Sequence, residues 1–263
     1  MEISQYKNLE EFDEHALVVK IDEPSVGLKG FIAIDRTKDN FPALGATRLW
    51  KYSSEEDAAN DALRLAKLMG KKSVMAGLPY TGAKAVLMFP EEGIKNREEF
   101  FKAYAQKIND LSGQFVTGTD VGLTDEDLRV MSEHSKFVIG MGVPAAYYTA
   151  VGIFNVIKTS LEYKFGSANI SGRTFAIQGL GKTGCELLKL LYAEGATIFV
   201  SEINTDVLER VCHDFPLVKK VFSEDIHKQE VDVFCPCAMS HALNSFTVNE
   251  LKCAIVVGSA NNQ

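Results

Sequence analysis

The stretch TFAIQGLGKTGCELLKLL (residues 174–191) indicates the fold of the second half of the chain. The apolar run TFAIQ precedes glycines in G-x-G-x-x-G spacing, and apolar residues at helical spacing follow them. Glu202 comes directly after the next apolar run, TIFVS (197–201). A strand, a glycine turn, a helix and a second strand with an acid at its end form the pattern of a dinucleotide-binding βαβ unit.

Each part of this pattern has a physical purpose. Gly179 permits the tight turn, Gly181 lets backbone amides approach a pyrophosphate, and Gly184 allows close packing of helix on strand. Lys182 and Thr183 then open the helix, where free N–H groups and the helix dipole favour an anion. The pattern thus predicts a dinucleotide site, although glycines alone also fit a turn that binds no cofactor.

Glu202 bears on the choice of dinucleotide. A carboxylate at this position accepts hydrogen bonds from both hydroxyls of the adenosine ribose and repels a 2′-phosphate. This favours NAD over NADP, while Lys182 is a nearby cation that acts in the opposite direction.

Outward from this stretch, the two halves of the chain differ. Apolar runs and helical patterns alternate in the second half, which is typical of a parallel, doubly wound sheet, whereas the first half mixes the two. The expected fold class is α/β with two domains, residues 1–142 and 143–263, which meet near GMGVP (140–144). The expected strands are 15–20, 28–35, 83–88, 115–118, 137–140, 174–178, 197–201, 218–222, 231–235 and 254–258, and the expected helices are 58–68, 97–111, 124–134, 145–163, the segment from the glycine turn to 194, and a last helix from 205.

Composition excludes several classes of function. The net charge is −7 and lysines and arginines form no block, so nucleic acid and anionic membranes are poor partners. The N-terminus has no signal peptide, and no apolar run approaches the roughly 20 residues of a membrane span. The five cysteines lack a second pair at metal-site spacing, which predicts reduced thiols, no metal and a cytoplasmic protein.

Candidate catalytic residues lie in the first half. Lys72 and Lys84 flank a segment rich in Gly, Ala and Pro, where a dry pocket would let an ammonium bind a carboxylate or act as a base after its pKa is lowered. Both could equally reach the surface. Asp120 follows a strand-like run between two glycines, a position that also suits a helix cap or a turn.

At this point the sequence resembles the Glu/Leu/Phe/Val dehydrogenase family, most closely its leucine and phenylalanine dehydrogenase branch. The motifs occur in the order of the family and extend to the last residue. The matching stretches are ALGATRLW (43–50), DALRLAKLMGKKSVMAGLPYTGAK (61–84), TGTDVG (117–122), TAVG (149–152), QGLGKTG (178–184), FCPCA (234–238) and GSANNQ (258–263).

The resemblance implies residue roles. Lys72 would hold the α-carboxylate of the substrate, Lys84 would polarise the carbonyl and activate water, and Asp120 would move protons at the substrate nitrogen. Leu44, Gly45, Ala46 and Gly118 would line the substrate site. Besides the glycine turn and Glu202, the residues expected along the cofactor are Thr149, Cys237, Ala238 and Asn261.

The implied reaction is reversible oxidative deamination, in which an apolar or aromatic L-amino acid, NAD and water give a 2-oxo acid, ammonia and NADH. The resemblance also implies a homo-oligomer that assembles through the first domain. A non-catalytic NAD-binding regulatory or assembly protein is the alternative.

Three features depart from the family pattern. The glycine-rich run before the catalytic lysine is here PYTGA (79–83), and Gly118 stands where leucine-preferring relatives carry Ala, which favours aromatic substrates slightly. No cation for an acidic substrate side chain is identified. The chain also ends within a motif that family members continue, so it is either a natural short form or, as we expect, a fragment with weak NAD binding and little turnover. The run AIVVG (254–258) is then expected at the sheet edge.

Overall fold

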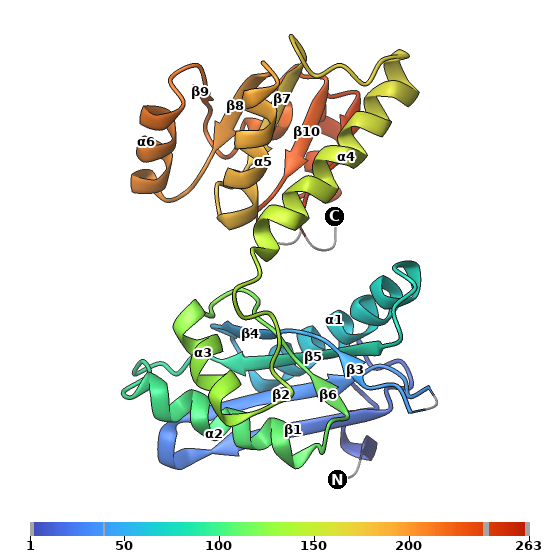
Figure 1. Cartoon of the computed structure of the whole chain (residues 1–263), viewed down its shortest axis with the longest axis vertical. Coiled ribbons are helices and arrows are strands. Elements are labelled where there is room, and N and C mark those ends of the chain that lie inside the picture. The colour runs from blue at the N-terminus through green and yellow to red at the C-terminus, as the bar shows by residue number, and fades with distance from the viewer. Residues whose placement is uncertain (1–2, 39, 239–241, 261–263) are drawn as a thin grey trace. The chain divides into compact units, whose positions relative to one another are not determined.

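The computed structural model describes residues 3–38, 40–238 and 242–260. The chain divides into two compact units, Met1–Val143 and Pro144–Gln263, and each is described by itself (Figure 1). Within the described ranges, no helix is both long enough and apolar enough to cross a membrane.

Unit 1 is built on a mixed sheet. The order β1-β2-β5-β3-β6 runs across it, and β4 also pairs with β5. The β1–β2–β5 part is antiparallel, whereas β3 and β4 are parallel to β5. The strands are β1 (Leu17–Glu23), β2 (Leu28–Ile34), β3 (Ala43–Leu44), β4 (Thr47–Trp50), β5 (Thr81–Met88) and β6 (Phe115–Val116).

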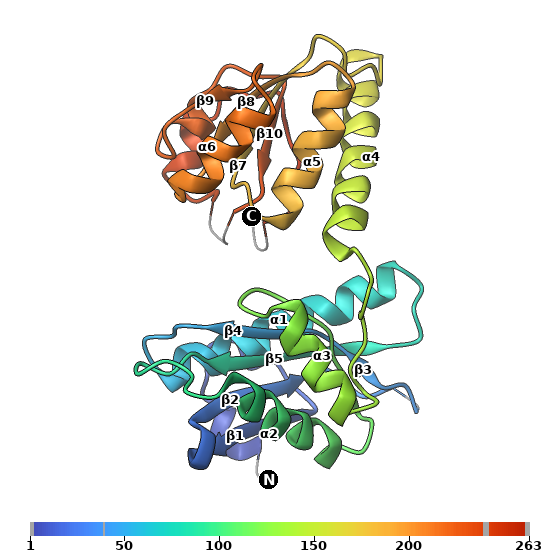
Figure 2. The same cartoon turned by 60° about the vertical axis from the view of Figure 1, so that its left-hand side comes forward.

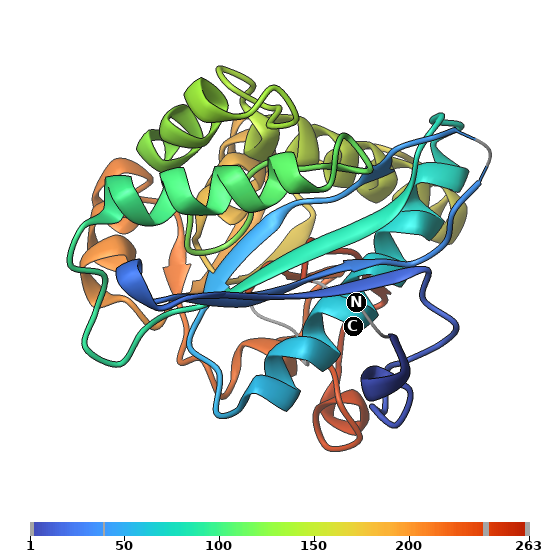
Figure 3. The same cartoon turned by 90° about the horizontal axis from the view of Figure 1, so that it is seen from below.

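Helices cover both faces of this sheet. Figure 3 shows α1 (Glu55–Met75) on one face and α2 (Arg97–Asp110) with α3 (Asp125–His134) on the other. Alternation along β5 separates the faces, because Ala83, Ala85 and Leu87 pack in the α2–α3 core while Val86 packs under α1. Lys84 shares the face of Val86, so its side chain lies on the α1 side.

α1 and β5 pass unusually close to each other. A Cβ on Gly82 would lie 2.1 Å from the backbone nitrogen of Gly70 and 2.2 Å from the carbonyl oxygen of Ala66. Only glycine fits there, because any side chain would push helix and strand apart. This contact fixes α1 against the strand that carries Lys84.

Unit 2 contains a parallel sheet with the order β11-β10-β7-β8-β9. The first strand in sequence, β7, lies in the middle, so the chain winds away from it in both directions and creates a switch point at its carboxyl end. The strands are β7 (Thr174–Gln178), β8 (Thr197–Ser201), β9 (Lys219–Lys220), β10 (Val233–Pro236) and β11 (Ile255–Val256).

The α-helices of unit 2 cover one face of the sheet. Figure 2 shows them as α4 (Ala145–Phe165), α5 (Lys182–Ala193) and α6 (Thr205–Asp214), and their apolar residues pack on Phe175 and Val233. Two short 3-10 helices, η3 (Ile226–Lys228) and η4 (Thr247–Glu250), follow β9 and β10, and η3 packs through Ile226 in a smaller core with Phe234. Both units thus form the expected two-domain α/β fold.

The structure corrects several expected elements. α1 continues past residue 68 to Met75, so Lys72 lies on its last turn. Residues 43–50 contain β3 and β4, which the sequence analysis missed. Residues 137–140 form no strand and contribute only a bridge between Val138 and Thr117. The strand expected at 218–222 is reduced to two residues.

Candidate active site and cofactor site

An ion pair joins buried Lys84 to partly buried Asp120 in unit 1. The Lys84 Nζ donates to Asp120 Oδ2 at 2.5 Å, although the residues are 36 positions apart. Lys84 comes from β5, and Asp120 follows β6 across the intervening 43–50 segment, where Thr47 bridges to Thr119. Lys84 is 5% exposed and Asp120 is only partly exposed, so the sheet places a buried ammonium beside a carboxylate that still meets solvent.

Arg48 and Asp61 extend this pair, and the sequence analysis assigned them no role. Arg48 Nε donates to the same Asp120 Oδ2 at 3.1 Å, and Arg48 Nη1 donates to Asp61 Oδ2 at 2.8 Å. Asp61 also accepts from Tyr52 Oη at 2.7 Å and from Arg64. Both Arg48 and Asp61 are buried, which is rare for charged residues without partners.

Burial and charge act in opposite directions on the central pair. Burial lowers the pKa of the Lys84 ammonium below its ordinary value, and Asp120 only partly opposes this. Burial alone would raise the pKa of Asp120, but the cations Lys84 and Arg48 outweigh it and hold that pKa below its ordinary value. Asp120 is thus an anion near neutrality, and Lys84 loses its proton more readily than a surface lysine.

Lys72 occupies a different setting from Lys84. It is exposed on the last turn of α1, two residues beyond the contact of Gly70 with Gly82. In the part of the chain that the structure describes, its ammonium makes no hydrogen bond or ion pair with another side chain. An exposed ammonium of this kind is available to an anion from solvent.

The other expected substrate-site residues lie along the two strands beside Lys84. Leu44 pairs with Gly82 and with Val116, and Ala46 accepts from the backbone of Ala85. Gly45 has a packing reason of its own, because a Cβ there would lie 2.1 Å from the Ala83 carbonyl oxygen.

Gly118 faces the chain that follows α3. A Cβ at Gly118 would lie 3.2 Å from the Ile139 carbonyl oxygen, so an alanine needs a small shift of that segment. Gly118 also accepts from the backbone of Thr47 at 2.9 Å, next to the 43–50 segment. These contacts bring Leu44, Gly45, Ala46 and Gly118 to the strands that carry Lys84 and precede Asp120.

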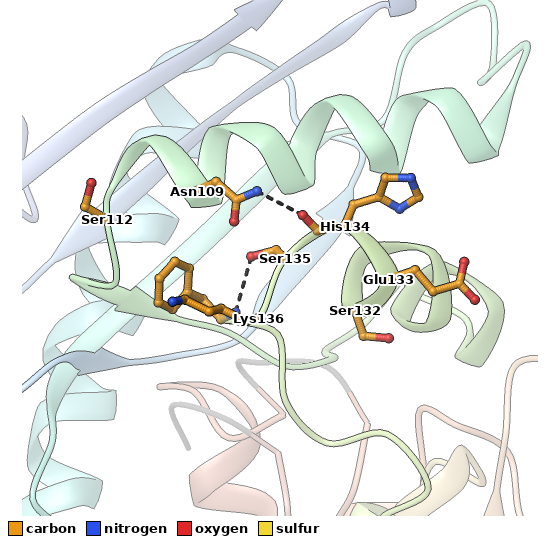
Figure 4. A pocket seen from close by; sticks show the side chains of 8 residues that line it. Asn109, Ser112, Ser132, Glu133, His134, Ser135 and Lys136 are labelled. Atoms are coloured by element: carbon orange, nitrogen blue, oxygen red, sulfur yellow. Dashed lines mark hydrogen bonds between the residues drawn. The ribbon is translucent and has the colours of Figure 1, made fainter.

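A surface depression lies elsewhere in unit 1. Figure 4 shows it between the end of α2 and the end of α3, where Asn109 Nδ2 donates to the His134 carbonyl at 2.9 Å. Its lining includes no candidate residue, and α2 and α3 cover the sheet face opposite to α1. We therefore base the candidate site on the buried charges rather than on this depression.

In unit 2 the glycine turn lies at the switch point of the sheet. Gly179 has φ of 94°, and a Cβ on it would lie 2.9 Å from Ala238. A Cβ on Gly184 would lie 2.1 Å from the Gly179 carbonyl oxygen and 3.4 Å from the Cys237 Cβ. By contrast, a Cβ on Gly181 would meet no heavy atom within 4 Å. Gly179 and Gly184 are thus required by packing, and Gly181 leaves open space.

Glu202 closes over this turn. Its Oε2 accepts from the backbone N–H of Leu180 at 2.7 Å, and its Oε1 accepts from that of Asn204 at 2.9 Å. These bonds orient the carboxylate beside the glycine turn, and a carboxylate retains acceptor capacity beyond one bond per oxygen.

Some of the remaining cofactor-site candidates lie at the glycine turn, and others lie elsewhere in unit 2. Cys237 and Ala238 follow β10 and contact the glycine turn, and Cys237 donates its backbone N–H to Gln178 at 2.8 Å. Lys182 and Thr183 form the first turn of α5, with Lys182 exposed. Asn261 lies outside the described residues. Thr149 is exposed on α4 and donates to the Ala145 carbonyl one turn earlier in the helix.

Two buried polar atoms support a ligand at this edge. Gln178 Oε1 and Ser201 Oγ belong to residues paired across β7 and β8, and among the described residues neither atom has a hydrogen-bond partner. Buried polar atoms are usually satisfied. With the open space at Gly181 and an α5 N-terminus without a side-chain cap, these atoms fit a dinucleotide at the carboxyl ends of β7 and β8.

Comparison with known proteins gives the family. The family described as "Glu/Leu/Phe/Val dehydrogenase, dimerisation domain" matches residues 15–137. Leucine dehydrogenase of Bacillus subtilis is 38% identical over 98% of this chain and 71% of its own length. Phenylalanine dehydrogenase of Bacillus thermotolerans is 38% identical over 97% of this chain and 69% of its own length. The chain belongs to the Glu/Leu/Phe/Val dehydrogenase family.

Solved structures agree. The L-tryptophan dehydrogenase of Nostoc punctiforme is 35% identical, with a TM-score of 0.70 over 95% of this chain and 71% of the other. The hetero-hexameric glutamate dehydrogenase of Thermus thermophilus has a TM-score of 0.72 over 93% of this chain and 66% of the other, at 17% identity. The latter likeness supports the fold alone.

Proposed function

We propose that the protein is an NAD-dependent amino-acid dehydrogenase that oxidatively deaminates an apolar or aromatic L-amino acid to its 2-oxo acid and ammonia. The observation that carries the proposal is the Lys84–Asp120 pair, in which a buried lysine of lowered pKa lies beside a carboxylate whose pKa is also lowered. The similarity to leucine, phenylalanine and tryptophan dehydrogenases supports the substrate class.

Lys72, Lys84 and Asp120 of unit 1 have different roles in the proposed reaction. Lys72 binds the α-carboxylate of the substrate through its exposed ammonium. After Cα has been oxidised, neutral Lys84 takes a proton from a water molecule as the water oxygen bonds to Cα. Asp120 takes a proton from the substrate ammonium before Cα is oxidised and later returns it to the nitrogen. The C–N bond then breaks, ammonia leaves, and the hydroxyl proton passes to Asp120 as the carbonyl forms. Exclusion of bulk water around Lys84 strengthens each of these interactions.

Unit 2 supplies the redox partner. NAD, when bound, accepts the hydride that leaves Cα. The N–H groups of the glycine turn, with Lys182 and Thr183, would hold the pyrophosphate, and Glu202 would bind the adenosine ribose. Members of this family depend on a pyridine nucleotide, and the choice of NAD rests on the Glu202 carboxylate, which would repel a 2′-phosphate. Cys237, Ala238, Thr149 and Asn261 complete the set that we assign to the cofactor.

We further propose that unit 1 forms a homo-oligomer, since residues 15–137 match a dimerisation domain. A cytoplasmic location is consistent with five free cysteines. Light scattering on the purified chain gives the number of subunits, and a monomer at micromolar concentration would contradict the assembly proposal.

The test of function is reduction of NAD or NADP at alkaline pH with apolar and aromatic L-amino acids, with L-glutamate as the control substrate. We expect NADH from one or more of the apolar or aromatic substrates, with higher turnover in the longest natural form of the protein than in this chain. Binding of NAD without turnover in either form would contradict the proposal and favour a non-catalytic NAD-binding protein.

A further inference from the structure

Asp120 has two cationic partners on one oxygen. Its Oδ2 accepts from Lys84 Nζ at 2.5 Å and from Arg48 Nε at 3.1 Å. The two donors differ in one respect that matters for chemistry. A buried lysine can lose its proton, whereas an arginine remains protonated at any pH the protein meets.

Arg48 is itself fixed at its far end. Its Nη1 donates to Asp61 Oδ2 at 2.8 Å, so the guanidinium bridges a carboxylate on α1 and the carboxylate that follows β6. Asp61 is held in turn by Tyr52 and Arg64. A planar fork that meets two carboxylates at once has few orientations available to it.

We infer that Arg48, anchored by Asp61, is a positioning residue for the proposed reaction, because it holds the Asp120 carboxylate in place while Lys84 gains and loses its proton. The inference rests on the proposed function and adds a residue to it. Without Arg48, a neutral Lys84 would leave a partly buried carboxylate with no cation beside it, and such a group is costly. Asp120 would then take up a proton or turn away.

The charged groups around Lys84 determine whether each substitution raises or lowers the pKa of this residue. Asp120 and Asp61 favour its ammonium form and Arg48 disfavours it, while burial disfavours it most. Removing the charge of Arg48 should therefore raise the pKa of Lys84, and removing the charge of Asp61 should lower it. Arg64 and Tyr52 keep their bonds to Asp61 in Arg48→Gln, whereas in Asp61→Asn an NH2 group replaces one of the two acceptor oxygens of residue 61.

The experiment compares Arg48→Gln, Arg48→Lys and Asp61→Asn. A brief pulse of acetic anhydride at a series of pH values, read by peptide mass spectrometry, gives the pH midpoint for acetylation of Lys84 without any cofactor. Steady-state kcat and KM are measured beside it. Arg97→Gln is the matched control, because Arg97 pairs with buried Asp127 on the opposite sheet face.

Arg48→Gln should move the Lys84 midpoint to higher pH and lower kcat by about 10- to 100-fold, the worth of one charged hydrogen bond, with little change in KM. Arg48→Lys should leave the midpoint near that of the parent and still lower kcat, because one ammonium cannot make both contacts of the fork. Asp61→Asn should move the midpoint to lower pH. Arg97→Gln should lower the stability and leave the midpoint unchanged.

Two results would overturn the inference. One is full rescue of kcat by Arg48→Lys, which would reduce the role of Arg48 to charge alone. The other is an unmoved Lys84 midpoint in folded Arg48→Gln and Asp61→Asn proteins. Failure of the proposed function looks different, because the parent protein would then produce no NADH whatever the labelling shows.

Discussion

The candidate site of unit 1 is formed by side chains, whereas that of unit 2 is formed mainly by backbone. In unit 1 the site consists of charged side chains, with Lys84, Asp120 and Arg48 joined by direct hydrogen bonds in a buried network. In unit 2 the site consists largely of backbone, and its main requirement is the lack of side chains at Gly179 and Gly184. The site of unit 1 depends on the charged side chains that are present, whereas the site of unit 2 depends on positions that carry no side chain.

This contrast predicts different sensitivities. Changes that keep shape but remove charge should disable the site of unit 1 and leave its fold intact. In unit 2, one added methyl group should lower either the unfolding free energy or the affinity for the ligand, depending on which glycine is replaced. The following experiments test this contrast from the largest expected effect to the smallest.

Lys84→Ala should have the largest effect. General acid–base groups contribute about 10²- to 10⁴-fold, so we expect kcat to fall by about 10³-fold or more while NAD still binds to unit 2. Stopped assays for NADH and calorimetry with NAD measure the two quantities.

Asp120→Asn should also lower kcat by orders of magnitude in a folded protein, and a mild loss would make Asp120 a turn residue only.

Gly184→Ala and Gly181→Ala should separate fold from ligand binding. A methyl on Gly184 meets the Gly179 carbonyl, and overpacking of this kind costs about 1–3 kcal/mol of unfolding free energy. A methyl on Gly181 meets only open space, so that variant should keep the stability of the parent and bind NAD more weakly. Denaturant unfolding and NAD titration of both variants give the comparison, and equal NAD affinity in Gly181→Ala and parent would remove the pyrophosphate from this turn.

Glu202→Ser should reduce the preference for NAD over NADP. Hydrogen bonds to a charged group are worth about 1.5–3 kcal/mol, so the ratio of the two affinities should change by about tenfold or more. Titration of both cofactors measures it. An unchanged ratio would show that another group reads the ribose.

The smallest effect is a pH dependence of stability. Because the pKa of Lys84 is lowered in the folded state, the unfolded chain binds more protons at pH values between the folded pKa and the unfolded value near 10.4. The burial penalty is therefore fully present below the folded pKa and is relieved as pH rises through this window. Relative to Lys84→Met, the parent should gain unfolding free energy between pH 8 and 10, as measured by urea unfolding, and parallel curves would argue against a lowered pKa.

The site of unit 2 was easier to predict from the sequence than the site of unit 1. The glycine turn is local, so spacing within 174–184 was sufficient to place the strand, the turn and the helix. The start of the helix expected at 124–134 was also local, because Thr124 and Asp127 form a capping box within four consecutive residues.

The charge network was less readable because it is assembled by strand pairing and by α1. Arg48 and Asp61 lie in stretches that carry the family resemblance, yet nothing in their neighbours shows that each faces a carboxylate or a guanidinium. The strands at 43–50 were missed because they are short, are separated by a glycine, and bury an arginine. The last turns of α1 were missed because Gly70 looks like a stop, whereas it is where helix and strand touch.

The most direct test of the central claim is transfer of deuterium from the substrate. L-Leucine or L-phenylalanine labelled with deuterium at Cα is incubated with the protein and NAD, and the reduced cofactor is analysed by mass spectrometry. The account predicts deuterated NADH at every turnover of the parent protein, and about 10³-fold less of it in the same time with Lys84→Ala. Bound NAD that stays unreduced, or NADH without deuterium, would contradict it.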